Sequence, residues 1–94
     1  DSARAVRWAH EHAAQFGGSP ERLTLAGHSA GAYIAAMLAL DTRYLREAGI
    51  DPRAIRAAAL LAGAYDFYPF TERYGREALG YWPKPLDTQP ITFA

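Results

Sequence analysis

The sequence of 94 residues contains no cysteine, which excludes disulfides, thiolate nucleophiles and thiolate metal sites. It also has no excess charge of either sign, because ten acidic side chains balance ten basic ones. Without a long-range field, neither nucleic acid nor an anionic membrane surface is an expected partner. The longest apolar stretch, Ala30 to Leu40, is shorter than the about 20 residues that span a bilayer. These absences favour a small globular domain with no membrane span.

The chain has no recognisable signal peptide. It starts at Asp1, without a methionine, and moves directly into a helical pattern, so we expect its natural beginning to be missing. The absence of cysteine identifies no compartment. The compartment therefore stays open, with the cytoplasm favoured.

Apolar side chains recur at three- and four-residue steps near the start, which predicts an amphipathic helix over 2–16. Asp1 or Ser2 is available as its N-cap and Gly17 as its stop. The residues expected on its apolar face are Ala5, Trp8, Ala9, Ala13 and Phe16.

Two short strands, over 22–26 and 55–62, are predicted with helices around them. Residues 30–40 are almost wholly apolar and predict a helix buried on most sides, and 41–49 predicts a shorter one with Tyr44 and Leu45 on its inner side. A last helix is expected over 71–79, and the proline-containing remainder is expected to be loop. Because the second strand lacks polar alternation, we expect it to be covered on both faces, as in a parallel sheet.

This order predicts an α/β fold, with a partial doubly wound parallel sheet and flanking helices. Two strands leave an apolar face and an edge to be covered by something else. We therefore interpret residues 1–94 as a fragment of one domain, which self-associates if it folds alone.

The most specific motif is Gly27-His28-Ser29-Ala30-Gly31, which fits G-x-S-x-G. It falls between a predicted strand and a predicted helix, where a nucleophile elbow lifts a serine hydroxyl out of the sheet on a strained backbone. We expect a side chain at either glycine to clash where strand and helix nearly touch. Ser29 would lie at a helix N-terminus, and the N–H of Ala30 is placed to donate to an oxyanion.

The stretch from Phe16 to Gly31, preceded by Trp8, resembles the carboxylesterase and hormone-sensitive-lipase branch of the α/β-hydrolases. In that branch a helix ends in a GG-[DS]-P turn, followed by the strand and the elbow. Residues 61–67 are similar to the strand-end segment G-x-Y-D-L of the same branch, including its kynurenine-formamidase-like members. The resemblance implies a carboxylic ester hydrolase that forms an acyl-enzyme at Ser29, with Ala30 as an oxyanion donor. No metal or organic cofactor is implied.

The histidines of the chain are His10, His12 and His28, and none follows Ser29. In this fold the triad runs serine, acid, histidine along the chain. We therefore expect the catalytic histidine, the acid and a second oxyanion loop to lie outside these residues, and the isolated chain to have little or no esterase activity. An arylformamidase-like amidase remains an alternative, because esters and amides react through the same intermediate. A non-catalytic binding module with this fold is a third reading, against which the retained serine argues.

The remaining candidates are weaker. Asp66 follows the second strand, from which a few lipases draw their triad acid; a capping or turn-fixing carboxylate is the competing interpretation. For His28 a packing role is favoured over catalysis, and for His10 and His12 a solvated helix face is favoured over metal binding. Asp41 and Asp51 are predicted caps. Aromatic residues gather in the last third and either line a substrate pocket or lid near Ser29 or cover the sheet: Tyr65, Phe67, Tyr68, Phe70, Tyr74, Tyr81 and Trp82.

Overall fold

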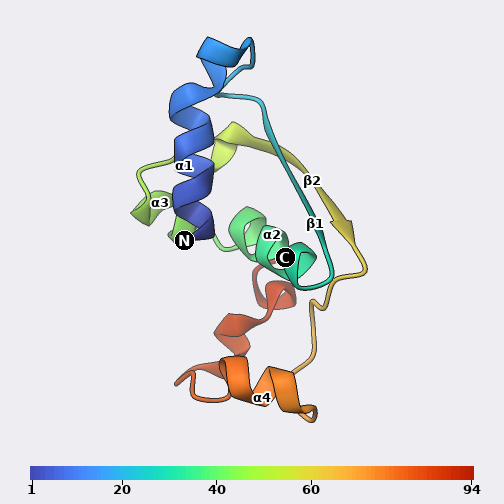
Figure 1. The fold of residues 1–94 in the computed structure, drawn as a ribbon. Coiled ribbons are helices and arrows are strands. Elements are labelled where there is room, and N and C mark those ends of the chain that lie inside the picture. Colours follow the sequence, from blue (N-terminus) through green and yellow to red (C-terminus); the bar gives the residue numbers. More distant parts are fainter.

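Two parallel strands form the sheet of the computed structural model, which describes all residues 1–94 (Figure 1). Strand β1 (Leu23–His28) pairs with β2 (Ile55–Leu61), with Leu25 opposite Ala58 and His28 opposite Leu61. Parallel neighbours need a crossover connection, and here two helices between the strands provide it. The predicted α/β class, with a partial parallel sheet and flanking helices, is confirmed.

The crossover consists of α2 (Ala30–Leu40) and the shorter α3 (Arg43–Glu47). Helix α2 has the predicted bounds, and five of its residues are buried. Leu45 of α3 is fully buried, and Tyr44 packs beside it, as expected. The core lies between these helices, the first helix and the near face of the sheet. Its buried residues are Val6, Leu38, Leu45, Ile50 and Ala54.

The first helix, α1 (Ser2–His12), tightens into a 3₁₀ turn over Ala13–Phe16 and ends at Gly17. Gly17 has φ +84°, a left-handed conformation that glycine adopts without a Cβ penalty, so the predicted stop is confirmed.

The face that α1 turns to the core differs from the prediction. Val6 is buried and Ala3 packs against the core, whereas Trp8 and Phe16 are 56% and 74% exposed. The apolar periodicity identified a helix correctly, but the stripe with the largest side chains was wrongly expected to face the core of this chain. The Ala3–Val6 side packs instead against the cluster that contains Leu38 of α2 and Leu45 of α3.

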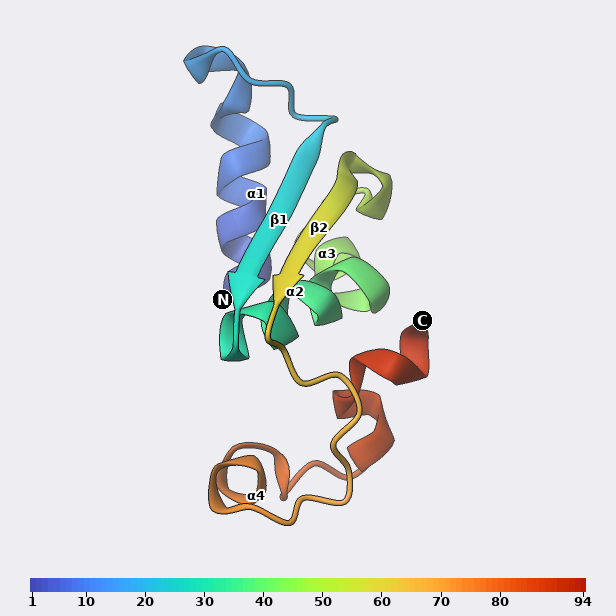
Figure 2. The same cartoon turned by 90° about the vertical axis from the view of Figure 1, so that its right-hand side faces the viewer.

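Only one face of the sheet is covered. Figure 1 shows α1, α2 and α3 on the same side of the strands, and Figure 2 shows them all behind the sheet. On the open side Ala57 and Ala59 are exposed and Leu61 is 61% exposed. The expectation that β2 is covered on both faces is therefore wrong for this chain, because its crossover supplies helices to one side alone.

The chain after β2 lies beyond the carboxyl ends of both strands (Figure 2). It contains α4 (Arg73–Leu79), as predicted, and two 3₁₀ turns, Pro85–Thr88 and Pro90–Phe93, where loop was predicted. A proline in the first turn sets φ near its helical value without the loss of a needed donor, which favours both turns. The aromatic-rich segment therefore does not cover the sheet, and that interpretation of it is wrong.

Of the two aspartates predicted as caps, Asp51 is confirmed as an N-cap, whereas Asp41 stands one residue before Thr42, the N-cap position of α3, although its carboxylate also accepts a backbone N–H. The Asp51 carboxylate accepts from the N–H of Arg53 at 3.0 Å, at the start of the 3₁₀ turn Pro52–Ala54. The Asp41 carboxylate accepts from the N–H of Arg43, the first residue of α3, at 3.2 Å.

None of the helices combines the length with the apolar character that crossing a bilayer requires.

Candidate active site

The backbone turns abruptly at Ser29, between the end of β1 and the start of α2. Ser29 has φ +56° and ψ −118°, which only a strongly constrained non-glycine residue adopts. Its N–H donates to the carbonyl of Leu61 at 2.8 Å, and its carbonyl accepts from the N–H of Tyr33 at 3.1 Å. These bonds tie the turn to both β2 and α2. The side chain of Ser29 is exposed, at the beginning of a helix.

The two glycines of the motif are not equivalent. A Cβ at Gly27 would lie 2.7 Å from the N of Ala32 and would collide with the carbonyl group of Gly31. A Cβ at Gly31 would meet nothing within 4 Å. The expected clash is therefore present at Gly27, and the same expectation is wrong at Gly31. The reason is directional: the Cβ position of Gly27 faces the helix backbone, whereas that of Gly31 faces away from the strand.

Ala30 is the first residue of α2, so its N–H has no partner inside the helix. The N–H groups of a first turn and the helix dipole both favour a negative charge beside them. Ala30 is exposed and borders the same pocket as Ser29. Its place agrees with an oxyanion donor, a role that remains a prediction.

A pocket of about 690 Å³ opens beside Ser29. The turn at Ser29, helix α2, the loop that follows β2 and α4 all contribute to it. Glu72 is its one charged lining residue, so the pocket suits an uncharged group. The lining residues are Ser29, Ala30, Tyr33, Ala62, Gly63, Ala64, Phe67, Phe70, Thr71, Glu72, Tyr74, Gly75, Ala78 and Leu79.

Three of the seven aromatic residues singled out in the sequence line this pocket: Phe67, Phe70 and Tyr74. The rings of Phe67 and Phe70 lie 5.6 Å apart. By contrast, Tyr81 and Trp82 contact each other outside the pocket and are 74% and 39% exposed. The pocket interpretation of the aromatic segment therefore holds for Phe67, Phe70 and Tyr74 and not for the other four residues.

Ala62 is a second strained residue in the pocket, and the sequence did not reveal it. It follows β2 with φ +53° and lies in the pocket lining with Ser29. The sharp turns at the carboxyl ends of the two neighbouring strands thus meet at one place. A β-carbon at positive φ is costly, by about 1–3 kcal/mol, and such positions gather at functional sites. No local motif marks Ala62.

The weaker candidates lie outside the pocket. Asp66 is exposed, and its carboxylate makes no hydrogen bond or ion pair, so the structure supports neither a cap nor a contact with Ser29. His28 is the last residue of β1; it is exposed and does not line the pocket. Strand alternation places it on the open face of the sheet, with Thr24 and Ala26.

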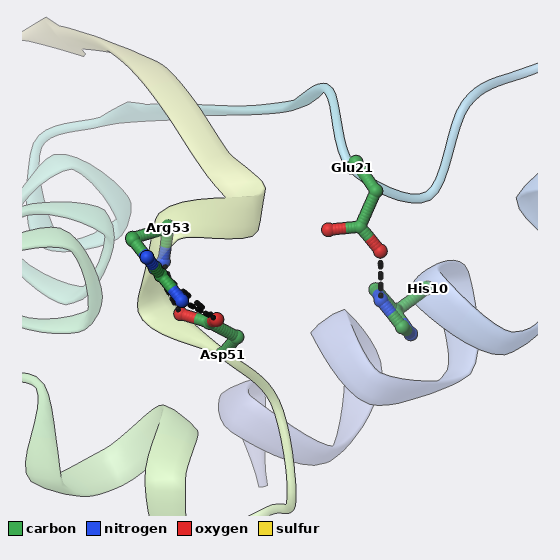
Figure 3. Close-up of polar contacts among 4 residues, drawn as sticks. All are labelled: His10, Glu21, Asp51 and Arg53. Atoms are coloured by element: carbon green, nitrogen blue, oxygen red, sulfur yellow. Dashed lines mark hydrogen bonds and ion pairs between the residues drawn. The ribbon is translucent and has the colours of Figure 1, made fainter.

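The two histidines of α1 contact residues on or beside that helix. His10 Nε2 lies 3.5 Å from a carboxylate oxygen of Glu21, a contact drawn in Figure 3 with the Asp51–Arg53 ion pair. The His12 ring stacks on Trp8 at 4.2 Å, and its Nδ1 lies 2.7 Å from the Trp8 carbonyl oxygen. No three histidine, aspartate or glutamate side chains gather in a metal-binding arrangement.

A buried polar network adjoins the pocket and was missed in the sequence. Gln89 is fully buried, and its Oε1 accepts from the N–H of Phe67 at 2.6 Å. The Tyr33 hydroxyl donates to the Thr88 carbonyl at 2.6 Å. Burial raises the pKa of the Tyr33 phenol, and the nearby Tyr44 raises it further, so the phenol keeps the proton that it donates. Both Tyr33 and Phe67 line the pocket.

Comparison with known proteins identifies the family of the chain. A family model described as alpha/beta hydrolase fold matches residues 1–88. Esterase LipQ of Mycobacterium tuberculosis is 38% identical over 72 residues, which cover 70% of this chain and 16% of that protein. Carboxylesterase NlhH of the same species is 51% identical over 39 residues, which cover 42% of this chain and 12% of that protein.

Esterase B1 of Culex pipiens is 62% identical over 32 residues, which cover 34% of this chain and 6% of that protein. The chain thus spans at most 16% of the length of these three relatives. No solved structure matches it.

Proposed function

This chain belongs to the α/β-hydrolase family, and from that premise we propose that it supplies the nucleophile, Ser29, of a carboxylic ester hydrolase. One observation carries the proposal: Ser29 occupies a strained strand-to-helix turn beside an apolar pocket. The strain presents the hydroxyl at a helix N-terminus, where negative charge is stabilised. The names of the relatives, esterase and carboxylesterase, support ester bonds as the substrate.

In the proposed reaction Ser29 Oγ attacks the ester carbonyl carbon while a histidine takes the hydroxyl proton. The tetrahedral intermediate places its oxyanion near the N–H of Ala30 and a second N–H donor. Its collapse breaks the bond to the alcohol, which leaves with the proton from the histidine. Water then hydrolyses the acyl-enzyme with the same histidine as base. No histidine lines the pocket beside Ser29, so the base and its orienting acid come from outside these 94 residues.

Amide hydrolysis of the arylformamidase kind is the second candidate. It is favoured by Gly63-Ala64-Tyr65-Asp66, the segment similar to formamidase-like relatives, of which Gly63 and Ala64 line the pocket. Acyl transfer from an ester or an amide uses the same nucleophile and oxyanion site, and the two differ in the leaving group. A matched pair of substrates, an ester and an anilide with the same acyl group, distinguishes them: the proposal expects the ester to be hydrolysed faster.

The non-catalytic reading is tested by covalent labelling of the full-length protein with a fluorophosphonate, which reacts with activated serine hydroxyls. We expect stoichiometric labelling on the peptide that contains Ser29, and none in Ser29→Ala. A folded full-length protein that remains unlabelled and hydrolyses no ester would refute the proposed function.

The 94 residues prepared alone are expected to give no measurable ester turnover, since a serine without a base is a weak nucleophile at neutral pH. They are also expected to self-associate through the open sheet face, where Leu61 is 61% exposed. Light scattering that finds a well-folded monomer would contradict the second expectation.

A further inference from the structure

Gln89 is the most completely buried polar side chain near the pocket. It is fully enclosed, and no buried side-chain polar atom in the structure lacks a partner. Its Oε1 accepts from the N–H of Phe67 at 2.6 Å, and its Nε2 donates to Thr88 Oγ1 at 2.8 Å. Burying an amide is unfavourable unless both ends are bonded, so this pairing fixes the side chain in one orientation.

The backbone around Gln89 is held to two other parts of the molecule. The Thr88 carbonyl accepts from the Tyr33 hydroxyl of α2 at 2.6 Å, and the Ile91 N–H donates to the Tyr65 carbonyl at 3.0 Å. We call Thr88, Gln89 and Ile91 the C-terminal tether. Its bonds join helix α2, which begins directly after Ser29, to the loop that carries Phe67.

The pocket-lining loop has little else to hold it. Residues 62–72 contain no helix or strand, so no regular hydrogen-bond ladder sets the position of Phe67. Its ring packs edge-to-face on Tyr33 at 5.7 Å, a contact that orients the ring but leaves the backbone free to move. The bond from the Phe67 N–H to Gln89 is therefore the one hydrogen bond that holds the backbone of Phe67 in place.

We infer that Gln89 is a positioning residue: through Phe67 it sets the shape of the apolar pocket beside Ser29 and thereby selects esters with a large, uncharged acyl or alcohol group. The inference rests on the proposed function and extends it to substrate size. Gln89 is fully buried and does not line the pocket, so it acts through Phe67 and does not touch the substrate. A fixed ring gives binding contact to a bulky group, whereas a small acetyl group gains little from it.

The test compares Gln89→Met in the full-length protein with the wild type. Methionine keeps a similar volume and removes both hydrogen-bonding groups. With esters of one alcohol, we expect KM for the phenylacetyl ester to rise about tenfold and kcat for the acetyl ester to change less than about twofold. Hydrogen exchange of the peptide around Phe67 is expected to speed up about tenfold, because its amide loses a buried acceptor.

Tyr33→Phe is the second variant, because it deletes one hydroxyl and retains the ring against Phe67. It releases the tether from α2 and is expected to change KM in the same direction, by a smaller factor. Thr92→Ala is the matched control: its hydroxyl donates to the Leu86 carbonyl at 2.6 Å within the same segment but makes no bond to the pocket. We expect Thr92→Ala to leave both KM values unchanged.

If Gln89→Met fails to fold, Tyr33→Phe decides the question by the same two readouts. Unchanged size selectivity together with unchanged exchange around Phe67 would overturn the inference while fluorophosphonate labelling of Ser29 upholds the proposed function. A wild type that is neither labelled nor active would instead overturn the proposed function. The exchange experiment would then still show whether Gln89 holds the loop.

Discussion

Replacing Gly27 by alanine is expected to damage the elbow, whereas the same replacement at Gly31 is expected to be tolerated. The new Cβ at position 27 would stand 2.7 Å from the N of Ala32, about 0.7 Å closer than ordinary contact permits. The atoms in the way are backbone, so the start of α2 must move. Overpacking of this kind costs about 1–3 kcal/mol.

A shift of α2 would also carry Ser29 out of place, since the Tyr33 N–H bonds to the Ser29 carbonyl. A misplacement near 1 Å in an active site costs about a hundredfold in rate. At Gly31 the Cβ enters open space, and alanine favours a helix over glycine by up to about 1 kcal/mol. Gly27→Ala is therefore expected to lower the free energy of unfolding, and Gly31→Ala to raise it. The reaction rate at Ser29 is expected to fall strongly in Gly27→Ala alone.

The assay is urea unfolding of the full-length variants together with the rate of fluorophosphonate labelling at Ser29. We expect Gly27→Ala to lower the free energy of unfolding and slow labelling about a hundredfold, and Gly31→Ala to raise the free energy of unfolding by up to about 1 kcal/mol and leave the labelling rate near wild type. Equal tolerance of alanine at the two positions would refute the reasoning from the directions of the Cβ atoms.

Two further predictions follow from local geometry. Because Ser29 has φ +56°, Ser29→Gly is expected to remove labelling yet raise the free energy of unfolding by about 1 kcal/mol; urea denaturation that finds a loss would contradict the strain. Asp41 is 2% exposed, and hydrogen bonds from Arg43 lower the pKa of its carboxyl below the ordinary 3.8. The stabilisation from the ionised carboxyl is present above the unfolded-state pKa of Asp41 and is lost as the pH falls through its lowered folded-state pKa. Asp41→Asn is therefore expected to be less stable than wild type at neutral pH. The difference in free energy of unfolding between the two proteins is expected to close below about pH 4. A difference that persists unchanged in acid would exclude this origin.

The elbow could be predicted from the sequence because its requirements are local. A strand that must turn at once into a helix needs a small residue where the two backbones approach, and Gly27 provides it. Helix α2 and the stop at Gly17 follow from equally local causes, apolar composition and permitted φ. These features need no knowledge of the rest of the chain.

Other parts of the site depend on which segments meet in space. Ala62 and Gln89 carry no motif, and each matters only because β2 ends beside Ser29 and the last turns fold back under Phe67. The open space at Gly31 likewise depends on the direction in which a Cβ at that position would point. The spacing of Gly31 from Ser29 in the sequence does not reveal that direction.

Helix α1 also has one feature that follows from the sequence and another that depends on tertiary contacts. Periodicity establishes that residues 2–16 are helical, because it reflects the geometry of one turn. The choice between the Trp8 side and the Val6 side depends on the shape of α2 and α3, against which α1 packs. Sequence alone thus determined the strained turn at Ser29 and the elements around it, since short-range sterics dictate them. Tertiary structure decided the pocket, its buried amide and the covered face, because those arise from contacts between residues far apart in the chain.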